Sequence, residues 1–264
     1  MSTETEKKLA CSLTAETTEL IPFLPYLLQD FWLLGSDPNA MTELIKTHVD
    51  YSENTKVLDL ACGKGAVSIK IAQELRIKIK GIDLLPEFIE FAAKKAKEHK
   101  IEKLCDFVVE DINEAVKKEK DYDIVILGAV GNVLGSPAET LSKLKATIKM
   151  GGYILIDEAY LLDDVNQENV LYKNYEYLTE KQWWDLFKEA DLELIKTVSA
   201  SDLDSPENPD SDFGMANITK RANELIKNYP DKKNIFEGYI NSQQREYDDL
   251  ENNIEGVIWI LKKA

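Results

Sequence analysis

The chain has 264 residues, with 48 aspartates and glutamates against 32 lysines and arginines, so its formal net charge is −16. This charge repels polyanions and disfavours nucleic acid and anionic membrane surfaces as partners. The arginines are Arg76, Arg221 and Arg245. The planar groups that bind phosphate through paired hydrogen bonds are therefore scarce.

Length and residue types narrow the classes further. The chain is long enough for one large domain with an appendage, and no apolar run approaches the roughly 20 residues of a membrane-spanning helix. The polar N-terminus is unlike a signal peptide. The cysteines, Cys11, Cys62 and Cys105, are scattered, so we expect a reducing cytoplasm. Two histidines, His48 and His99, leave little room for a metal site, and we expect none.

Helices are predicted for the first 50 residues. An apolar stretch over 20–34 is broken by Pro22 and Pro25, which favours a short helix after a kink. The pair Asp37-Pro38 is typical of a helix start, and apolar residues follow at helical spacing as far as His48. Residues 1–50 are therefore expected to form an N-terminal helical cap.

Residues 56–158 alternate short apolar runs with amphipathic stretches. The runs predict strands, and the stretches between them predict helices, clearest at 66–75, 86–98 and 137–148. The expected strands are Lys56–Leu60, Ile77–Ile82, Cys105–Val109, Ile124–Leu127 and Tyr153–Ile156. Strands that are apolar on both faces and alternate with helices indicate a doubly wound α/β fold, a mostly parallel sheet covered on both sides.

The pattern loosens after Glu158. A capping box at Thr179 and Gln182 predicts a helix over 180–190, and 193–200 reads as a strand. A polar acidic loop over 201–212 precedes two helical stretches, 213–228 and 232–252, and a last strand over 256–262. We therefore expect a domain over 51–264 with a helical insertion, 201–253, between its last two strands.

The most informative segment joins the first strand to the next helix. It reads Asp59-Leu60-Ala61-Cys62-Gly63-Lys64-Gly65. Small residues let a ligand approach the backbone, and the start of a helix offers free N–H groups. This turn is therefore a candidate ligand-binding loop.

Acidic residues follow the next two strands. Asp83 comes at the end of the second strand, 18 residues beyond Gly65, where a carboxylate can accept hydrogen bonds from ribose hydroxyls. Glu110-Asp111-Ile112 follows the third strand. There a carboxylate can accept a hydrogen bond from an adenine amino group, and an aliphatic neighbour can cover the adenine ring. The fourth strand runs into Gly128, with Asn132 shortly after. Open parallel sheets bind ligands at these carboxyl ends.

These segments together resemble the class I S-adenosylmethionine-dependent methyltransferases, over about residues 50–160. The resemblance rests on D-L-A-C-G-K-G, G-I-D-L, E-D-I and Y-D-I-V-I-L-G in the family's order and spacing. It implies a Rossmann-like seven-stranded sheet with a reversed last strand, and S-adenosyl-L-methionine as the cofactor. Many members have Gly where this chain has Ala61, which puts in question only the local backbone angles.

The resemblance also implies roles for individual residues. Gly63 and Gly65 would pass close to the cofactor and Asp59 would anchor the loop, with Cys62 a small loop residue among them. Ala61 and Gly128 would lie near the methionine moiety. Asp83, beside Leu84, would hold the ribose, and Asp111 with Ile112 would hold the adenine. These positions complete the expected cofactor set: Asp59, Ala61, Cys62, Gly63, Gly65, Asp83, Leu84, Asp111, Ile112 and Gly128.

Some of these residues, and others along the chain, have alternative interpretations. A nicotinamide cofactor would need G-x-G-x-x-G, but here the pattern ends in Ser68. His99 near a helix end suits capping, and His48 suits packing. Aromatic residues outside the sheet, such as Trp32 or Tyr239, are more simply explained as packing residues, although some could cover an active site.

The function expected from the resemblance is methyl transfer to a small-molecule acceptor, by in-line attack on the sulfonium methyl. Asp157, Glu158 and Tyr160 are expected after the fifth strand, near where the methyl should project, and Asn132 after the fourth. Of these substrate-side residues, Glu158, Tyr160 and Asn132 are the candidate catalytic residues. Two alternatives stay open: a methyltransferase acting on a protein or peptide, and a non-catalytic protein that binds S-adenosylmethionine. The sequence also leaves a homodimer open.

Overall fold

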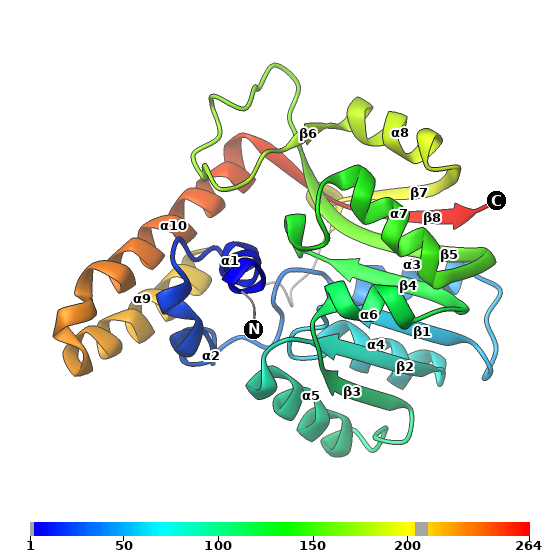
Figure 1. Ribbon diagram of the computed structural model, residues 1–264, viewed down its shortest axis with the longest axis horizontal. Coiled ribbons are helices and arrows are strands. Elements are labelled where there is room, and N and C mark those ends of the chain that lie inside the picture. The colour runs from blue at the N-terminus through cyan, green and yellow to red at the C-terminus, as the bar shows by residue number, and fades with distance from the viewer. Residues whose placement is uncertain (1–2, 204–210) are drawn as a thin grey trace. The chain divides into compact units, whose positions relative to one another are not determined.

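The computed structural model describes residues 3–203 and 211–264, and the chain divides into two compact units (Figure 1). The sheet unit comprises Trp32–Glu158, Glu180–Leu203 and Gly256–Ala264, and the helical unit comprises Met1–Phe31, Ala159–Thr179 and Asp204–Glu255. These boundaries differ from the expected cap over 1–50. Helix α3 (Pro38–His48) belongs to the sheet unit, where it packs against α4 (Ala66–Leu75).

The sheet has the expected doubly wound architecture. Its strand order is β3-β2-β1-β4-β5-β8-β7, with parallel pairing from β3 through to β5 and antiparallel pairing between β7 and β8. A two-residue eighth strand, β6 (Leu178–Thr179), pairs with the end of β5. The others are β1 (Lys56–Leu60), β2 (Lys78–Asp83), β3 (Cys105–Val109), β4 (Tyr122–Gly128), β5 (Ile148–Leu161), β7 (Leu192–Ser199) and β8 (Ile254–Lys263).

Helices cover both faces of this sheet. Helices α3, α4 and α5 (Pro86–Glu98) pack on one face, and α6 (Ile112–Lys118), α7 (Pro137–Thr147) and α8 (Glu180–Glu189) form the layer on the other. On the first face, Val57, Ile126 and Leu155 are buried in one apolar core with α3 and α4. Alternate strand positions share a face, so the same row leads to Asp59 and Gly128 at the strand ends.

Several elements of the sheet unit differ from the sequence prediction, and three of the differences lie at strand ends near the site. Helix α6 was not expected. The second strand is shifted by one residue from Ile77–Ile82 to Lys78–Asp83. Strand β5 extends to Leu161. Glu158 and Tyr160 therefore lie within the strand, whereas the sequence predicted them after its end. The expected strand stopped at Ile156 because the apolar run ends there, but backbone pairing continues along β4 and β6.

The helical unit is built around two long helices, α9 (Ser211–Asn228) and α10 (Lys233–Asn252), which run side by side (Figure 1). The expected acidic loop over 201–212 falls partly on residues outside those described. Shorter elements complete the unit: α1 (Thr3–Ser12), α2 (Leu24–Leu27) and the 3-10 segments Thr18–Phe23 and Pro230–Lys232. No helix in the described part of the chain is long and apolar enough to span a membrane.

Two polar clusters fix elements within the helical unit. Arg221 on α9 donates two hydrogen bonds to the Asp30 carboxylate, at 2.6 and 2.7 Å. The fully buried Asp249 on α10 accepts the backbone N–H groups of Leu171 and Tyr172, and the side-chain amide of Asn253. Since a buried carboxylate must be hydrogen-bonded to be tolerated, Asp249 ties the irregular segment before β6 to α10.

Candidate functional site

The turn after β1 has the shape that its small residues predict. Gly63 and Gly65 have positive φ angles of 53° and 75°, and α4 begins directly after Gly65. Ala61 also has a positive φ, 56°. The left-handed region is costly for a residue with a Cβ, so the position where related chains have Gly does require that conformation.

Backbone N–H groups of this turn are held by the end of β2. The Cys62 N–H donates to the Ile82 carbonyl, and the Gly63 N–H donates to the Asp83 carboxylate at 2.9 Å. The other Asp83 oxygen accepts the Leu85 N–H, also at 2.9 Å. Burial raises the pKa of Asp83 to about 6, although the N–H groups of Leu85, Gly63 and Leu84 lower it.

Asp59 anchors the turn from beneath. It is buried, and the Ser68 hydroxyl in the first turns of α4 donates to it at 2.6 Å. Burial raises the pKa of Asp59 to about 7; the Ser68 hydrogen bond lowers it, and the nearby Asp83 charge raises it. Asp59 thus joins the strand to the helix that starts the candidate ligand loop.

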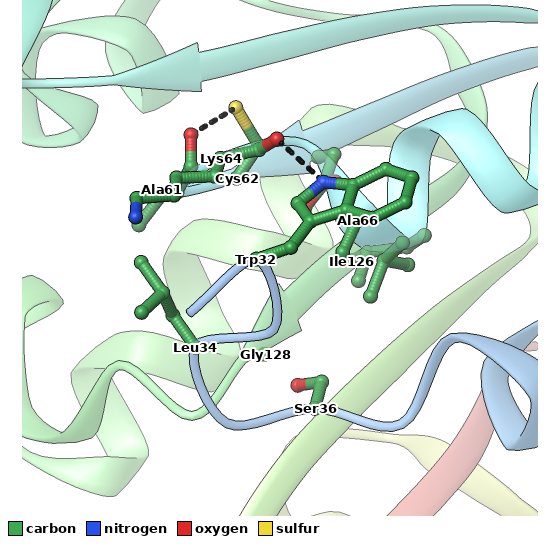
Figure 2. A pocket seen from close by; sticks show the side chains of 12 residues that line it. Trp32, Leu34, Ser36, Ala61, Cys62, Lys64, Ala66, Ile126 and Gly128 are labelled. Carbon is green, nitrogen blue, oxygen red and sulfur yellow. Dashed lines mark hydrogen bonds between the residues drawn. The ribbon is translucent and has the colours of Figure 1, made fainter. Parts of the chain in front are cut away.

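A hollow opens over this turn, with a volume of about 390 Å³ when the space open to solvent is included (Figure 2). It lies at the carboxyl ends of β1 and β4, where open parallel sheets bind ligands. Its lining comprises Trp32, Leu34, Ser36, Asp59, Ala61, Cys62, Gly63, Lys64, Ala66, Val67, Ile126 and Gly128. We call it the loop pocket.

Half of the predicted cofactor residues line the loop pocket: Asp59, Ala61, Cys62, Gly63 and Gly128. Burial and the Asp59 and Asp83 charges raise the pKa of the Cys62 thiol, which favours a small loop residue over a nucleophile.

The other half lie outside the pocket lining: Gly65, Asp83, Leu84, Asp111 and Ile112. A Cβ on Gly65 would lie 2.8 Å from the Ala92 Cβ and 3.0 Å from the Phe107 ring, so Gly65 allows close packing. Asp111 caps α6 by accepting the Asn113 N–H at 2.8 Å. Their cofactor roles stay predictions.

The structure does not bring the three catalytic candidates to the loop pocket. Asn132 is exposed in a 3-10 segment, Gly131–Leu134. Glu158 and Tyr160 point to the opposite face of β5 from Asp157, because successive strand residues alternate between faces. Asp157 is the register partner of the pocket residue Gly128. The Glu158 side chain therefore points away from the face on which Gly128 lines the pocket. Tyr160 belongs to the helical unit. Their catalytic roles stay predictions too.

A sequence profile described as a methyltransferase domain matches residues 51–201, more than half of the chain. The chain belongs to the methyltransferase domain family. It is 26% identical over 147 residues to the malonyl-(acyl-carrier protein) O-methyltransferase of Halalkalibacterium halodurans, covering 50% of this chain and 53% of that protein. It spans about half the length of the curated relatives it matches.

Solved structures share the fold over nearly the whole chain. A methyltransferase from Geobacter sulfurreducens, crystallised with S-adenosyl-L-homocysteine, has a TM-score of 0.74 at 19% identity, covering 92% of this chain and 98% of its own. The cyclase SpnF has a TM-score of 0.71 at 15% identity, covering 99% and 97%. At these identities the likeness shows the fold alone.

The loop pocket of this methyltransferase domain also contains residues that the sequence did not assign to it. Trp32 lies on the loop before α3, and its indole N–H donates to the Lys64 carbonyl at 3.1 Å (Figure 2). Its ring stacks on His99 at 5.8 Å, with the Lys95 ammonium 5.1 Å away. Trp32 was noted as an aromatic residue, but only the fold shows that it holds the turn.

Lys64 is unusually placed for a lysine in a ligand loop. Its side chain is buried, and its ammonium lies 5.6 Å from the Phe88 ring and 5.2 Å from the Phe91 ring of α5. Cation–π contacts of this kind offset part of the cost of burying the charge.

No group of three or more metal-binding side chains lies together among residues 3–203 and 211–264.

Proposed function

We propose that this chain transfers a methyl group from S-adenosyl-L-methionine to a small-molecule acceptor. The observation that carries the proposal is the loop pocket, in which Asp59, Ala61, Gly63 and Gly128 meet at the carboxyl ends of β1 and β4. Because the chain belongs to the methyltransferase domain family, a pocket at this position favours the methyl donor as its ligand.

The strand order supports the roles that the family resemblance implies. The adenine residues follow β3, the ribose acid ends β2, and the methionine-side residues Ala61 and Gly128 end β1 and β4, in the order β3-β2-β1-β4. Three steps between neighbouring strands span about 14 Å. An extended adenosyl group with its amino-acid tail fits this span, with Asp83 at the ribose and Asp111 at the adenine.

The chemistry asks little of the protein's side chains. The sulfonium methyl is already activated, so the protein mainly aligns the acceptor atom behind the carbon–sulfur bond and excludes water. A general base is needed only where the acceptor carries a proton that must leave. This suits a chain with two histidines.

Ligand-dependent melting tests the cofactor. S-adenosylhomocysteine at 100 times its dissociation constant should raise the free energy of unfolding by about 2.7 kcal/mol, whereas NAD should have no effect. A shift with NAD and none with S-adenosylhomocysteine would overturn the proposal.

A labelled methyl donor then distinguishes the acceptor classes. The enzyme is incubated with donor labelled in the methyl group and a cell extract, and the products are separated by ultrafiltration. Label found in the filtrate on a new compound, separated from the unreacted donor by chromatography, supports a small molecule. Label retained on protein supports the second reading, a peptide or protein acceptor, which the net charge of −16 permits if the acceptor is basic. No transferred label, although S-adenosylhomocysteine still raises the melting temperature, supports a non-catalytic binding protein.

The cysteines support a cytoplasmic location for this activity. Cys11, Cys62 and Cys105 are all free thiols. This favours the reducing cytoplasm, where small-molecule acceptors and the methyl donor are available.

A further inference from the structure

A carboxylate lies beside the loop pocket on the next strand of the sheet. Asp157 on β5 is the register partner of Gly128 on β4, and its carbonyl accepts the Ala129 N–H at 3.0 Å. Paired residues on neighbouring strands point to the same face. The Asp157 side chain therefore lies on the face where Ile126 and Gly128 line the loop pocket.

A buried hydroxyl connects this carboxylate to the pocket. Ser36 precedes α3 and lines the pocket (Figure 2). It is 7% exposed. A Cβ on Gly128 would lie 2.3 Å from the Ser36 Oγ, so the hydroxyl sits directly over Gly128. Ser36 Oγ and Asp37 Oδ2 have no hydrogen-bond partner among the described residues. Buried polar atoms without partners are rare, so these two atoms are available to a polar group that enters the pocket beside Asp157.

The surroundings of Asp157 suit a group that gains and loses a proton near neutral pH. Burial raises the pKa of Asp157 to about 7. The Ser36 hydroxyl lowers that pKa, although it approaches without ordinary hydrogen-bond geometry, and the charge of Asp37 raises it. The other Asp37 oxygen accepts the Ala40 N–H at the start of α3, so this carboxylate is held in place.

The strand order fixes which side of the cofactor Asp157 faces. Adenine, ribose and methionine residues follow β3, β2 and then β1 with β4, and β5 is next in line. Resting on the proposed function, we propose that Asp157 is the catalytic residue that receives the acceptor's proton, with Ser36 positioning it. The acceptor is then a group that carries a proton, most simply a hydroxyl or an amine, and not a thioether.

The step balances without another reactant. A lone pair on the acceptor oxygen or nitrogen forms the new bond to the methyl carbon. The carbon–sulfur bond breaks, and its electron pair stays on sulfur, which becomes a neutral thioether. The acceptor's proton passes to the Asp157 carboxylate and is later released to water.

Sinefungin gives a test that needs no knowledge of the acceptor. This analogue carries an amine where the donor carries its methyl, whereas S-adenosylhomocysteine carries nothing there. Calorimetry should show that Asp157→Asn weakens sinefungin binding by about tenfold or more and leaves S-adenosylhomocysteine affinity unchanged, because a charge-assisted contact is lost at one point only. In the wild type, the preference for sinefungin should fall as the pH is lowered through about 7, and it should be flat in the variant.

Controls separate this inference from the proposed function. Glu193→Gln removes an exposed carboxylate from β7 and should change neither affinity. Ser36→Ala should lower the preference for sinefungin less than Asp157→Asn does, and should shift its pH midpoint upward. Equal losses for both ligands in Asp157→Asn would place the residue at the methionine ammonium and overturn the inference. If neither ligand binds the wild type, the proposed function itself is wrong.

Discussion

The Asp83 carboxylate accepts the Gly63 N–H at 2.9 Å, so the end of β2 holds the turn after β1 in its pocket-forming shape. The second oxygen of the same carboxylate accepts the Leu85 N–H at the start of α5. One side chain therefore connects two strand ends and a helix. A ribose hydroxyl that bound to Asp83 would therefore meet a carboxylate whose position is already fixed by backbone N–H donors.

Replacing Asp83 should separate these two roles. Asp83→Ala removes both acceptors, and we expect it to lose most of the melting shift produced by S-adenosylhomocysteine and to lower the free energy of unfolding by about 1–3 kcal/mol. Asp83→Asn keeps one oxygen for the turn but offers a weaker partner to ribose hydroxyls. It should be nearer to wild type in stability than in affinity. An unchanged ligand shift in both variants would remove Asp83 from the ribose role.

The buried Asp59 predicts a pH dependence of stability. Its folded pKa of about 7 lies above the ordinary value of 3.8, so the folded state binds the proton more tightly than the unfolded state. The stabilisation of the folded state by the Asp59 proton is fully present below about pH 4 and is lost as the pH rises to about 7. Asp59→Asn keeps an acceptor for Ser68 and cannot ionise. Its free energy of unfolding in urea should therefore fall less than that of wild type between pH 5 and 7; parallel curves would contradict the assignment.

Much of the sheet could be predicted from sequence because its signals are local. The strands Lys56–Leu60 and Cys105–Val109 and the helix Ala66–Leu75 have the predicted bounds, and each is framed by turn residues. Helix α6 was missed because Asp111 was interpreted only as a ligand. The spacing Asp111 to Glu114 is that of a capping box and could have revealed the helix start.

The pocket was predicted less completely, because part of its lining, Trp32, Leu34 and Ser36, comes from a segment distant in sequence. Trp32 and Ser36 lie more than 20 residues before the ligand loop, and no local pattern places them over it. Asp157 shows a second limit. The face of a strand residue is defined only when the pairing register is known, so Glu158 and Asp157 could not be told apart from sequence.

Two glycines provide a matched test of close packing beneath the loop. Gly65 and Gly151 have similar φ angles, 75° and 72°, so alanine should suffer the same backbone strain at both. A Cβ at Gly65 would meet Ala92 at 2.8 Å, whereas a Cβ at Gly151 meets nothing within 4 Å. Gly65→Ala should therefore cost about 1–3 kcal/mol more than Gly151→Ala in chemical unfolding. Equal costs would mean that the helix pair relaxes freely.

The left-handed Ala61 predicts a stabilising substitution. Glycine adopts its φ of 56° without the Cβ clash, so Ala61→Gly should raise the free energy of unfolding by about 1 kcal/mol, the strain relieved less the added freedom of the unfolded chain. Affinity for S-adenosylhomocysteine should stay within about twofold of wild type, since the turn keeps its shape. A loss of stability would show that the alanine methyl packs favourably in the pocket wall.

In the helical unit, stability should depend strongly on Asp249. Asp249→Ala leaves the buried Tyr172 N–H without an acceptor, at a cost of about 1–3 kcal/mol, and also removes the acceptor of the part-buried Leu171 N–H. The segment between β5 and β6 should then be cleaved faster by protease, with cleavage sites mapped by mass spectrometry. Asp248→Ala is the matched control. Its carboxylate accepts a hydrogen bond from a surface side chain of the same helix, Gln244, so Asp248→Ala should change stability by less than about 0.5 kcal/mol. Equal protease sensitivity in the two variants would show that Asp249 does not hold this segment.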